Sequence, residues 1–331
     1  MIKSLLVIFL INSNFIDLFF LAKVRADSQE PTLEYVKDKS QMGSVVLLEK
    51  LIDDAMEIDD YKKALSISKK LLSKITDIDE SDQNISSYIK ILGKYSKYTE
   101  EQNKFIFNLL SRISILKSLL GEYDFAIKLF QEVINNAEKS YDKYKLELPF
   151  YYSELGNIHY ELGNYSAAEI LYEKSVEINL SELGYHEDTA DDINNLGKIY
   201  LAIGQYWLAI DYFERALYML KDLDTKDKSS LIRTKLNLAS ANLNFHDSQN
   251  LNKNSIYLRK AKKYQFKAYK LAKRYLKNSN PLLHIAINDL GAYFHSRNDL
   301  KKAVNLYEEA VVYIKRYKGI RHPILASTLS N

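Results

Sequence analysis

Residues 155–165 read Leu-Gly-Asn-Ile-His-Tyr-Glu-Leu-Gly-Asn-Tyr, and residues 196–206 read Leu-Gly-Lys-Ile-Tyr-Leu-Ala-Ile-Gly-Gln-Tyr. The two stretches lie 41 residues apart and agree in the leucine, both glycines, the isoleucine and the final tyrosine. A third copy, residues 290–300, has Asn298 at the second glycine position. Self-similarity at a fixed period is the mark of a repeat architecture, so this repetition decides the fold of the chain.

A small residue recurs after each copy and measures the period of the repeat. The residues at this position are Ala126, Ala168, Ala209, Ala261 and Ala303, at intervals of 42, 41, 52 and 42. The longer interval contains residues 245–254, a polar stretch that we interpret as an insert between two helices. A more divergent copy precedes these, around Asp59 and Ala64, with one more helix expected between it and the regular repeats.

Each recurring position has a physical reason. The turn positions are occupied by residue types that tolerate positive φ, namely Gly121, Gly163, Gly204, Asn298 and Asp59. The glycines inside helices, Gly156, Gly197 and Gly291, are expected to let a neighbouring helix approach closely. An aromatic residue stands four positions after four of the five alanines, and it is expected to fill the groove between helices. The residues at that position are Phe130, Tyr172, Phe213 and Tyr307.

Periodicity and composition both predict helices. Ile193, Leu196, Tyr200 and Ile203 form a stripe at i, i+3, i+7 and i+10, which is typical of an amphipathic helix. The chain of 331 residues contains only 10 Gly and 4 Pro, few breakers for a turn-rich β architecture. Helices of this length are marginal alone, so each pair must bury its apolar stripe against the next pair. The expected fold class is therefore all-α.

The combined pattern of Leu-Gly, aromatic, Gly-X-Tyr and Ala resembles the tetratricopeptide repeat. The spacing of about 42 residues and the linkers at 183–186 and 322–323 resemble its kinesin-light-chain-like subclass. The resemblance covers residues 45–331 and is strong from residue 107, with His159 in place of the usual tyrosine and with two insertions. It implies a right-handed α–α superhelix of about five to six helix pairs. Exported bacterial proteins that join such repeats to a CHAT protease-like domain are a nearer likeness than kinesin itself.

The expected organisation follows from this register. Residues 1–26 are a signal peptide, 27–44 a polar linker, 45–106 divergent helices similar to tetratricopeptide repeats, and 107–331 the regular array. Its repeats lie near 107–148, 149–189, 190–231, 232–283 with the insert 245–254, and 284–325, and a further helix starts at 322–331. The chain stops inside that helix. A truncated chain, a split gene and a partner that caps this end are three explanations that stay open.

The first 26 residues have the layout of a secretory signal peptide. Lys3 precedes an apolar stretch from Leu5 to Leu21, and small residues at Val24 and Ala26 precede a polar segment. We expect cleavage after Ala26 and export to a periplasm, lumen or extracellular space. The alternative is a membrane anchor formed by residues 1–22. Asp17 disfavours it, because a charge at mid-bilayer costs about 3 kcal/mol.

The resemblance implies a peptide-binding groove lined by the first helix of each repeat. Asparagine both donates and accepts hydrogen bonds, so it can hold an extended peptide backbone. Asn194 and Asn195 match the Asn-Asn of the family's Leu-Asn-Asn-Leu-Gly motif, and Asn237 and Asn288 match it in part. The full set of candidate groove residues is Asn157, Tyr160, Asn194, Asn195, Lys198, Arg233, Asn237, Asn288 and His295. The alternative interpretation is that these are solvated helix positions.

A dicarboxylate clamp, which some family members use, is disfavoured. It needs Lys or Arg at positions where this chain has Asp191, Ile285 and Asp289. Those residues would repel or ignore a terminal carboxylate.

Several function classes find no support in the sequence. The six His form no paired-ligand motif, no phosphate-binding or nucleophile-elbow glycine motif occurs, and there is no Cys. We therefore expect no enzyme activity, no cofactor, no metal and no small-molecule substrate. The net charge is only +3, and we interpret the basic run from Arg259 to Arg274 as a solvated helix face, so no nucleic-acid partner is expected.

Two hypotheses of function remain. The first is a non-enzymatic scaffold that binds an extended peptide or a partner helix in the groove, with a protein or peptide as its ligand. The second is the recognition half of a split CHAT-type protease system whose catalytic domain is on another chain.

Overall fold

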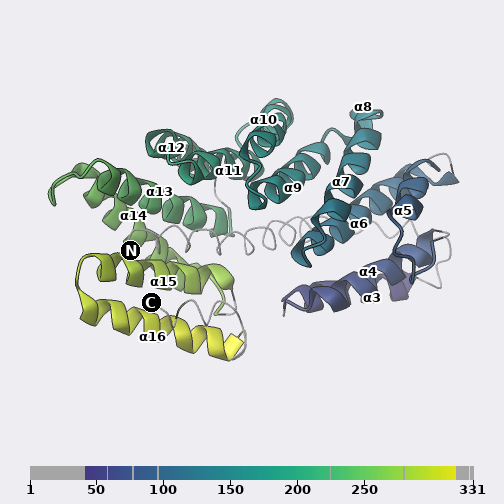
Figure 1. Ribbon diagram of the computed structural model, residues 1–331. Helices are drawn as coiled ribbons and strands as arrows, with labels where there is room; N and C mark the ends of the chain where they lie inside the picture. Colours follow the sequence, from purple (N-terminus) through teal and green to yellow (C-terminus); the bar gives the residue numbers. More distant parts are fainter. Residues whose placement is uncertain are drawn as a thin grey trace. The chain divides into compact units, whose positions relative to one another are not determined.

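The structure is a computed structural model, and it describes residues 42–317 apart from residues 58, 77, 95–96, 224 and 279, together with Thr328. Every regular element within this part of the chain is an α-helix (Figure 1). The expected signal peptide, most of the expected linker and the start of a further helix at 322–331 fall outside the described residues, except for Thr328. None of the described helices is both long and apolar enough to span a bilayer.

The described residues up to Leu171 form one compact unit. It contains α3 (Met42–Glu57), α4 (Tyr61–Ile75), α5 (Ile85–Leu92), α6 (Glu100–Leu119), α7 (Tyr123–Glu138), α8 (Tyr141–Tyr144), α9 (Leu148–Glu161) and the beginning of α10 (Tyr165–Glu182). The helices α3 and α4 pack as a pair, as do α6 and α7, while α5 and α9 both contact α7. The single helix expected between the divergent copy and the regular repeats corresponds to α5.

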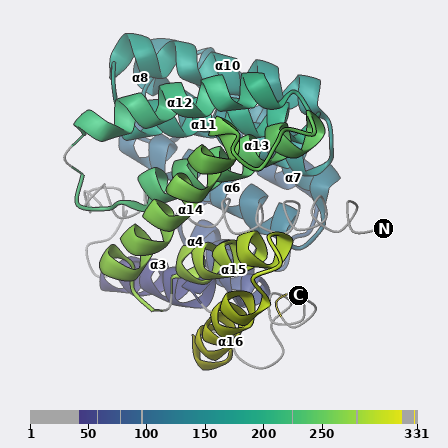
Figure 2. The same cartoon turned by 90° about the vertical axis from the view of Figure 1, so that its left-hand side faces the viewer.

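The described residues from Tyr172 on form a second compact unit. After the rest of α10 it contains α11 (Glu187–Ala202), α12 (Tyr206–Asp222), α13 (Ser229–Ser248), α14 (Ile256–Tyr275), α15 (Pro281–Ser296) and α16 (Leu300–Tyr317). Consecutive helices pair as α11 with α12, α13 with α14 and α15 with α16 (Figure 1). The first helices also contact one another, α11 with α13 and α13 with α15. Figure 2 shows α14, α15 and α16 from a second direction.

The turns between paired helices have the conformation that their residues predict. Gly121, Gly163, Gly204, Asn298 and Asp59 all have positive φ, between 60° and 83°. The following residue then donates its N–H to a carbonyl five positions back, as Gln205 does to Tyr200 at 2.8 Å. This pattern satisfies the carbonyls left over at a helix end. Helix starts are capped as well: Asn280 accepts from the N–H of Leu282, and Pro281 occupies the first turn of α15.

The glycines inside helices stand where an aromatic ring meets the backbone. A Cβ atom added to Gly197 would lie 2.6 Å from the ring of Phe213, and one added to Gly291 would lie 2.7 Å from the ring of Tyr307. Phe213 and Tyr307 come four residues after the recurring Ala209 and Ala303, and both alanines are buried. The predicted close approach of paired helices is confirmed at these two repeats.

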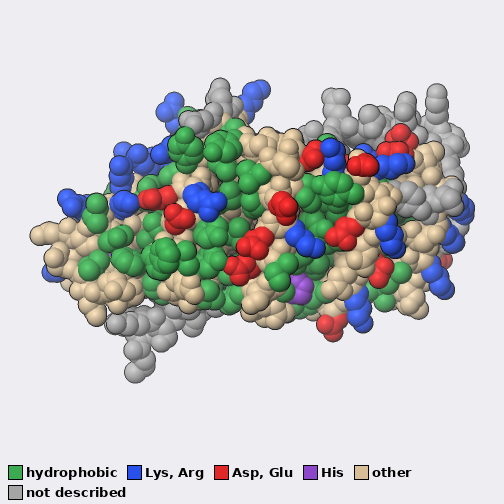
Figure 3. All heavy atoms as spheres, turned by 90° about the horizontal axis from the view of Figure 1, so that it is seen from above, with side chains coloured by type: hydrophobic (Ala, Val, Ile, Leu, Met, Phe, Trp, Pro, Cys, Tyr) green, Lys and Arg blue, Asp and Glu red, His purple; other side chains and the backbone are tan. Residues whose placement is uncertain are grey.

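The core of the second unit runs between helix pairs. One cluster joins α11, α12 and α13 through Leu201, Phe213, Leu217 and Leu238. Another contains residues of α13, α14, α15 and α16. Some large apolar side chains stay outside it: Trp207 is 62% exposed. Figure 3 likewise shows hydrophobic side chains at the surface between charged ones on the face drawn.

Candidate functional site

The first helices of the second unit carry a polar face, which we call the inner-helix face. We define it by polar side chains of α11, α13 and α15: Asp191, Asn194, Asn195, Lys198, Ser230, Arg233, Asn237 and Asn288. All of them are buried except Asn237, which is half-buried. Seven of these eight side chains are thus buried.

An asparagine pair lies at the centre of this face. The side-chain amide of Asn237 on α13 donates to Oδ1 of Asn194 on α11 at 3.1 Å. The Nδ2 atoms of Asn194 and Asn195 are buried and have no hydrogen-bond partner among the described residues. Asn194 is only 1% exposed and Asn195 only 3% exposed. A buried donor left without an acceptor costs about 1–3 kcal/mol, so each of these two amide groups would be stabilised by donating to a carbonyl oxygen.

Arg233 is held in a buried ion pair with Asp191. Its guanidinium Nη1 lies 3.2 Å from Oδ1 of Asp191, and both side chains are buried. The hydroxyl of Ser230 donates to the other carboxylate oxygen of Asp191 at 2.9 Å. Arg233 is thereby fixed as a counter-ion between α11 and α13. The sequence did contain a signal for this pair, because Asp191 and Arg233 are 42 residues apart and occupy equivalent positions of adjacent repeats.

Burial dominates the electrostatics at this ion pair. It raises the pKa of Asp191 to about 6, although the neighbouring Arg233 acts in the opposite direction. Burial also raises the pKa of Glu187, one turn earlier on α11. One buried arginine therefore faces more than one carboxyl group, and this end of the face has no surplus positive charge with which to bind an anionic ligand.

A second buried carboxylate ties α10 to α11 within the same unit. Asp192 Oδ2 accepts from the hydroxyl of Ser175 at 2.5 Å and from the amide of Asn179 at 2.9 Å. Sequence reasoning had not singled out these residues for function. Their contacts show a structural role, because they satisfy buried polar groups between two helices.

The remaining predicted groove residues are spread along the chain. Asn288 on α15 is buried, whereas His295 at the end of the same helix is exposed. Asn157 is buried and Tyr160 half-buried on α9, which belongs to the first unit. The ring of Tyr160 lies 5.5 Å from that of Tyr165. Two of the nine predicted residues, Asn194 and Asn237, are joined by a direct hydrogen bond.

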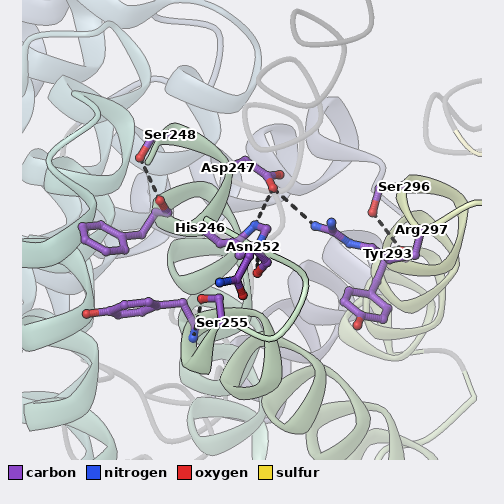
Figure 4. Close-up of polar contacts among 10 residues, drawn as sticks. His246, Asp247, Ser248, Asn252, Ser255, Tyr293, Ser296 and Arg297 are labelled. Carbon is purple, nitrogen blue, oxygen red and sulfur yellow. Dashed lines mark hydrogen bonds and ion pairs between the residues drawn. The ribbon is translucent and has the colours of Figure 1, made fainter. Parts of the chain in front are cut away.

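The expected insert at 245–254 forms the connection between α13 and α14, and side-chain hydrogen bonds hold it in place. Its first four residues continue α13, and the rest lead into α14. His246 is buried, with its ring nitrogens 2.8 Å from Oδ1 of Asp247 and 3.2 Å from the carbonyl of Asn252 (Figure 4). Arg297, after α15, reaches the same oxygen of Asp247 at 3.4 Å. His246 thus stabilises this connection. No group of three or more potential metal ligands occurs among the described residues.

Comparison with known proteins agrees with this architecture. A family model described as the tetratricopeptide repeat matches residues 105–181 and, overlapping them, residues 151–222. The crystal structure of BtubC (BKLC) from P. vanneervenii is similar, with a TM-score of 0.56 at 18% identity, over 72% of this chain and 91% of that one.

Two structures of complexes are also similar. NprR in complex with its cognate peptide NprX has a TM-score of 0.52 at 18% identity, over 93% of this chain and 83% of that one. A Rap protein complexed with Competence and Sporulation Factor has a TM-score of 0.54 at 10% identity, over 87% of this chain and 86% of that one. These likenesses show the fold, and the expectation of an all-α superhelix is confirmed.

Among curated proteins, the transcription elongation factor SPT6 of Candida glabrata is 32% identical over 103 residues. The match covers 31% of this chain and 7% of that protein, so it carries no assignment of function.

Proposed function

We propose that this tetratricopeptide-repeat protein is a non-enzymatic binding module that holds an extended segment of another protein on its inner-helix face. Its repeats are of the kinesin-light-chain-like type, with equivalent residues about 42 positions apart. The proposal concerns the second unit, where α11, α13 and α15 lie next to one another.

The observation that carries the proposal is the pair of buried amide donors at Asn194 and Asn195. Neither Nδ2 atom has an acceptor among the described residues. An extended peptide offers free backbone carbonyls that would satisfy both donors. An α-helical ligand uses most of its carbonyls internally, so unmatched amides favour an extended ligand over a partner helix.

The charges on this face support a ligand that is recognised through its backbone. Asp191 and Arg233 neutralise each other, and the pair is already hydrogen-bonded to Ser230. A ligand with a strong charge would have to break a buried ion pair, which costs several kcal/mol. The fold supports the proposal as well, because NprR, which has a similar fold, was solved with its cognate peptide.

The test is a selection of displayed random peptides on the full chain, followed by affinity measurements on variants. We expect Asn194→Ala/Asn195→Ala to weaken binding of the selected peptides at least ~10-fold, because two hydrogen bonds of about 1 kcal/mol each are lost. The matched control is Asn278→Ala/Asn305→Ala, which removes two exposed amides elsewhere in the same unit. Equal affinities for the two double variants, with melting temperatures unchanged, would disprove the proposal.

A further inference from the structure

The helix α14 is strongly and one-sidedly basic. Its 20 residues include eight Lys or Arg and no Asp or Glu. Its apolar side is made of small residues such as Ala261, Ala268 and Ala272, and all three are buried in the core. The charged side faces solvent on a chain whose net charge is only +3, so positive charge is concentrated on this one element.

Five of the eight basic residues form a single row, which we call the α14 crest: Arg259, Lys263, Lys267, Lys270 and Arg274. Their spacing of i, i+4, i+8, i+11 and i+15 places them along one edge of the helix, over about 22 Å. All five are exposed, and none makes an ion pair with a described residue. Like charges at this spacing repel one another and destabilise the free helix.

Two of the three other lysines of α14 are neutralised by the neighbouring helices. Lys260 bonds to Glu214 of α12 at 2.9 Å, and Lys273 bonds to Glu309 of α16. The carboxylates of Glu214 and Glu309 therefore lie on either side of the crest. The positive charge that they leave uncompensated is confined to the width of one helix. The positive field reaches the interior, where burial, with added repulsion from Lys267 and Lys221, lowers the pKa of Lys235 on α13 to about 8.

We propose that the α14 crest is a second interaction surface, which binds a linear acidic segment of a partner protein. A row of five cations along a straight helix matches a row of carboxylates on a helix or extended strand, and pairing would remove the repulsion within the crest. This surface lies on the second helix of its repeat and is separate from the inner-helix face.

The geometry favours an acidic polypeptide over other polyanions. A basic amphipathic helix binds membranes by inserting its apolar side, and the apolar side of α14 is already buried in the core. A flat anionic bilayer or a nucleic-acid duplex is wider than one helix, so it would also meet the carboxylates of Glu214 and Glu309. A linear segment can follow the crest between them.

The experiment uses the full chain and a fluorescein-labelled poly-glutamate peptide of about 15 residues, followed by fluorescence anisotropy. The crest variant is Lys263→Gln/Lys267→Gln/Lys270→Gln. The control is Lys62→Gln/Lys63→Gln/Lys70→Gln, which removes three exposed lysines from α4. We expect the crest variant to lose at least ~10-fold in affinity and the control to change less than ~2-fold. Binding to the wild-type chain should weaken as salt is added.

Glutamine is a good helix former, and the crest variant removes repulsion, so it should melt no lower than the wild type. Equal peptide affinities for the two triple variants would overturn the proposal. Crest-dependent binding of phosphatidylserine vesicles or of duplex DNA, without binding of the peptide, would also overturn it in favour of those anions. The Asn194→Ala/Asn195→Ala variant should bind the poly-glutamate peptide as tightly as the wild type does. This result would show that the crest binds independently of the inner-helix face.

Discussion

At the scale of single residues, the close approach of two of the helix pairs depends on a glycine in the first helix of the pair. Gly197 on α11 faces the ring of Phe213 on α12, and Gly291 on α15 faces the ring of Tyr307 on α16. Each ring is fully or nearly fully buried and occupies the space that a Cβ atom would need. Glycine within a helix lowers its stability, and at these two positions close packing of the ring against the backbone offsets that cost. Neither glycine is needed for a turn.

We predict that Gly197→Ala lowers the free energy of unfolding by about 1–2 kcal/mol. Alanine gains about 1 kcal/mol in helix propensity. A Cβ atom 2.6 Å from the ring of Phe213 places the overpacking cost in the upper part of its usual range, at about 2–3 kcal/mol. Urea denaturation measures the difference. The control is Gly93→Ala, where the added Cβ would make an ordinary 3.6 Å contact and the backbone is already right-handed helical. A variant at Gly197 as stable as the wild type would contradict the packing described.

At the scale of elements, neighbouring first helices are joined by polar contacts at the repeat spacing. Asp191 to Arg233 spans 42 residues and Asn194 to Asn237 spans 43. The residues directly before Leu196, Leu238 and Leu290 are equivalent in register, and they are Asn195, Asn237 and Asp289. The α15 helix thus has a carboxyl group where α11 and α13 have an amide.

We predict that Asp289→Asn stabilises the protein at alkaline pH and has little effect in acid. Burial raises the pKa of Asp289 to about 7, so the folded state favours the protonated carboxyl. The cost of its charged form is fully present above that pH and disappears as pH falls below the ordinary value of about 4. The variant should therefore gain about 1–2 kcal/mol at pH 8 and lose this advantage as the pH falls to about 4.

Thermal or urea unfolding of both chains across this pH range measures the effect. The exposed Asp211→Asn on α12 is the control, and it should track the wild type. A stabilisation by Asp289→Asn that did not change with pH would rule out the titration of Asp289 as its cause.

At the scale of the whole molecule, we propose that the protein is exported after removal of residues 1–26. The layout of the first 26 residues supports this, with a basic start, an apolar stretch and small residues at Val24 and Ala26. Intact-mass spectrometry of the protein from its native host should find a chain that begins at Asp27. A mass that includes Met1 would contradict cleavage and favour an anchor formed by residues 1–22.

The sequence by itself determined the fold class and much of the local geometry. Turn residues such as Gly204 and Asn298 specify positive φ, and Pro281 marks a helix start, because these effects depend on the residue and its near neighbours. The period of about 42 residues then identifies helix pairs and their order. Part of the candidate site followed as well, since Asn194 and Asn237 were expected to line the same face, and the structure joins them.

Only the tertiary structure decided how these side chains are engaged. Burial and charge pairing depend on helices that are distant in sequence. Arg233 was expected to face a ligand, but α11 supplies Asp191 as its counter-ion. Similarly, all the lysines of α14 look alike in the sequence, yet Glu214 and Glu309 on the neighbouring helices neutralise Lys260 and Lys273 and leave the crest uncompensated. Such partners are set by packing between repeats, which a local pattern does not specify.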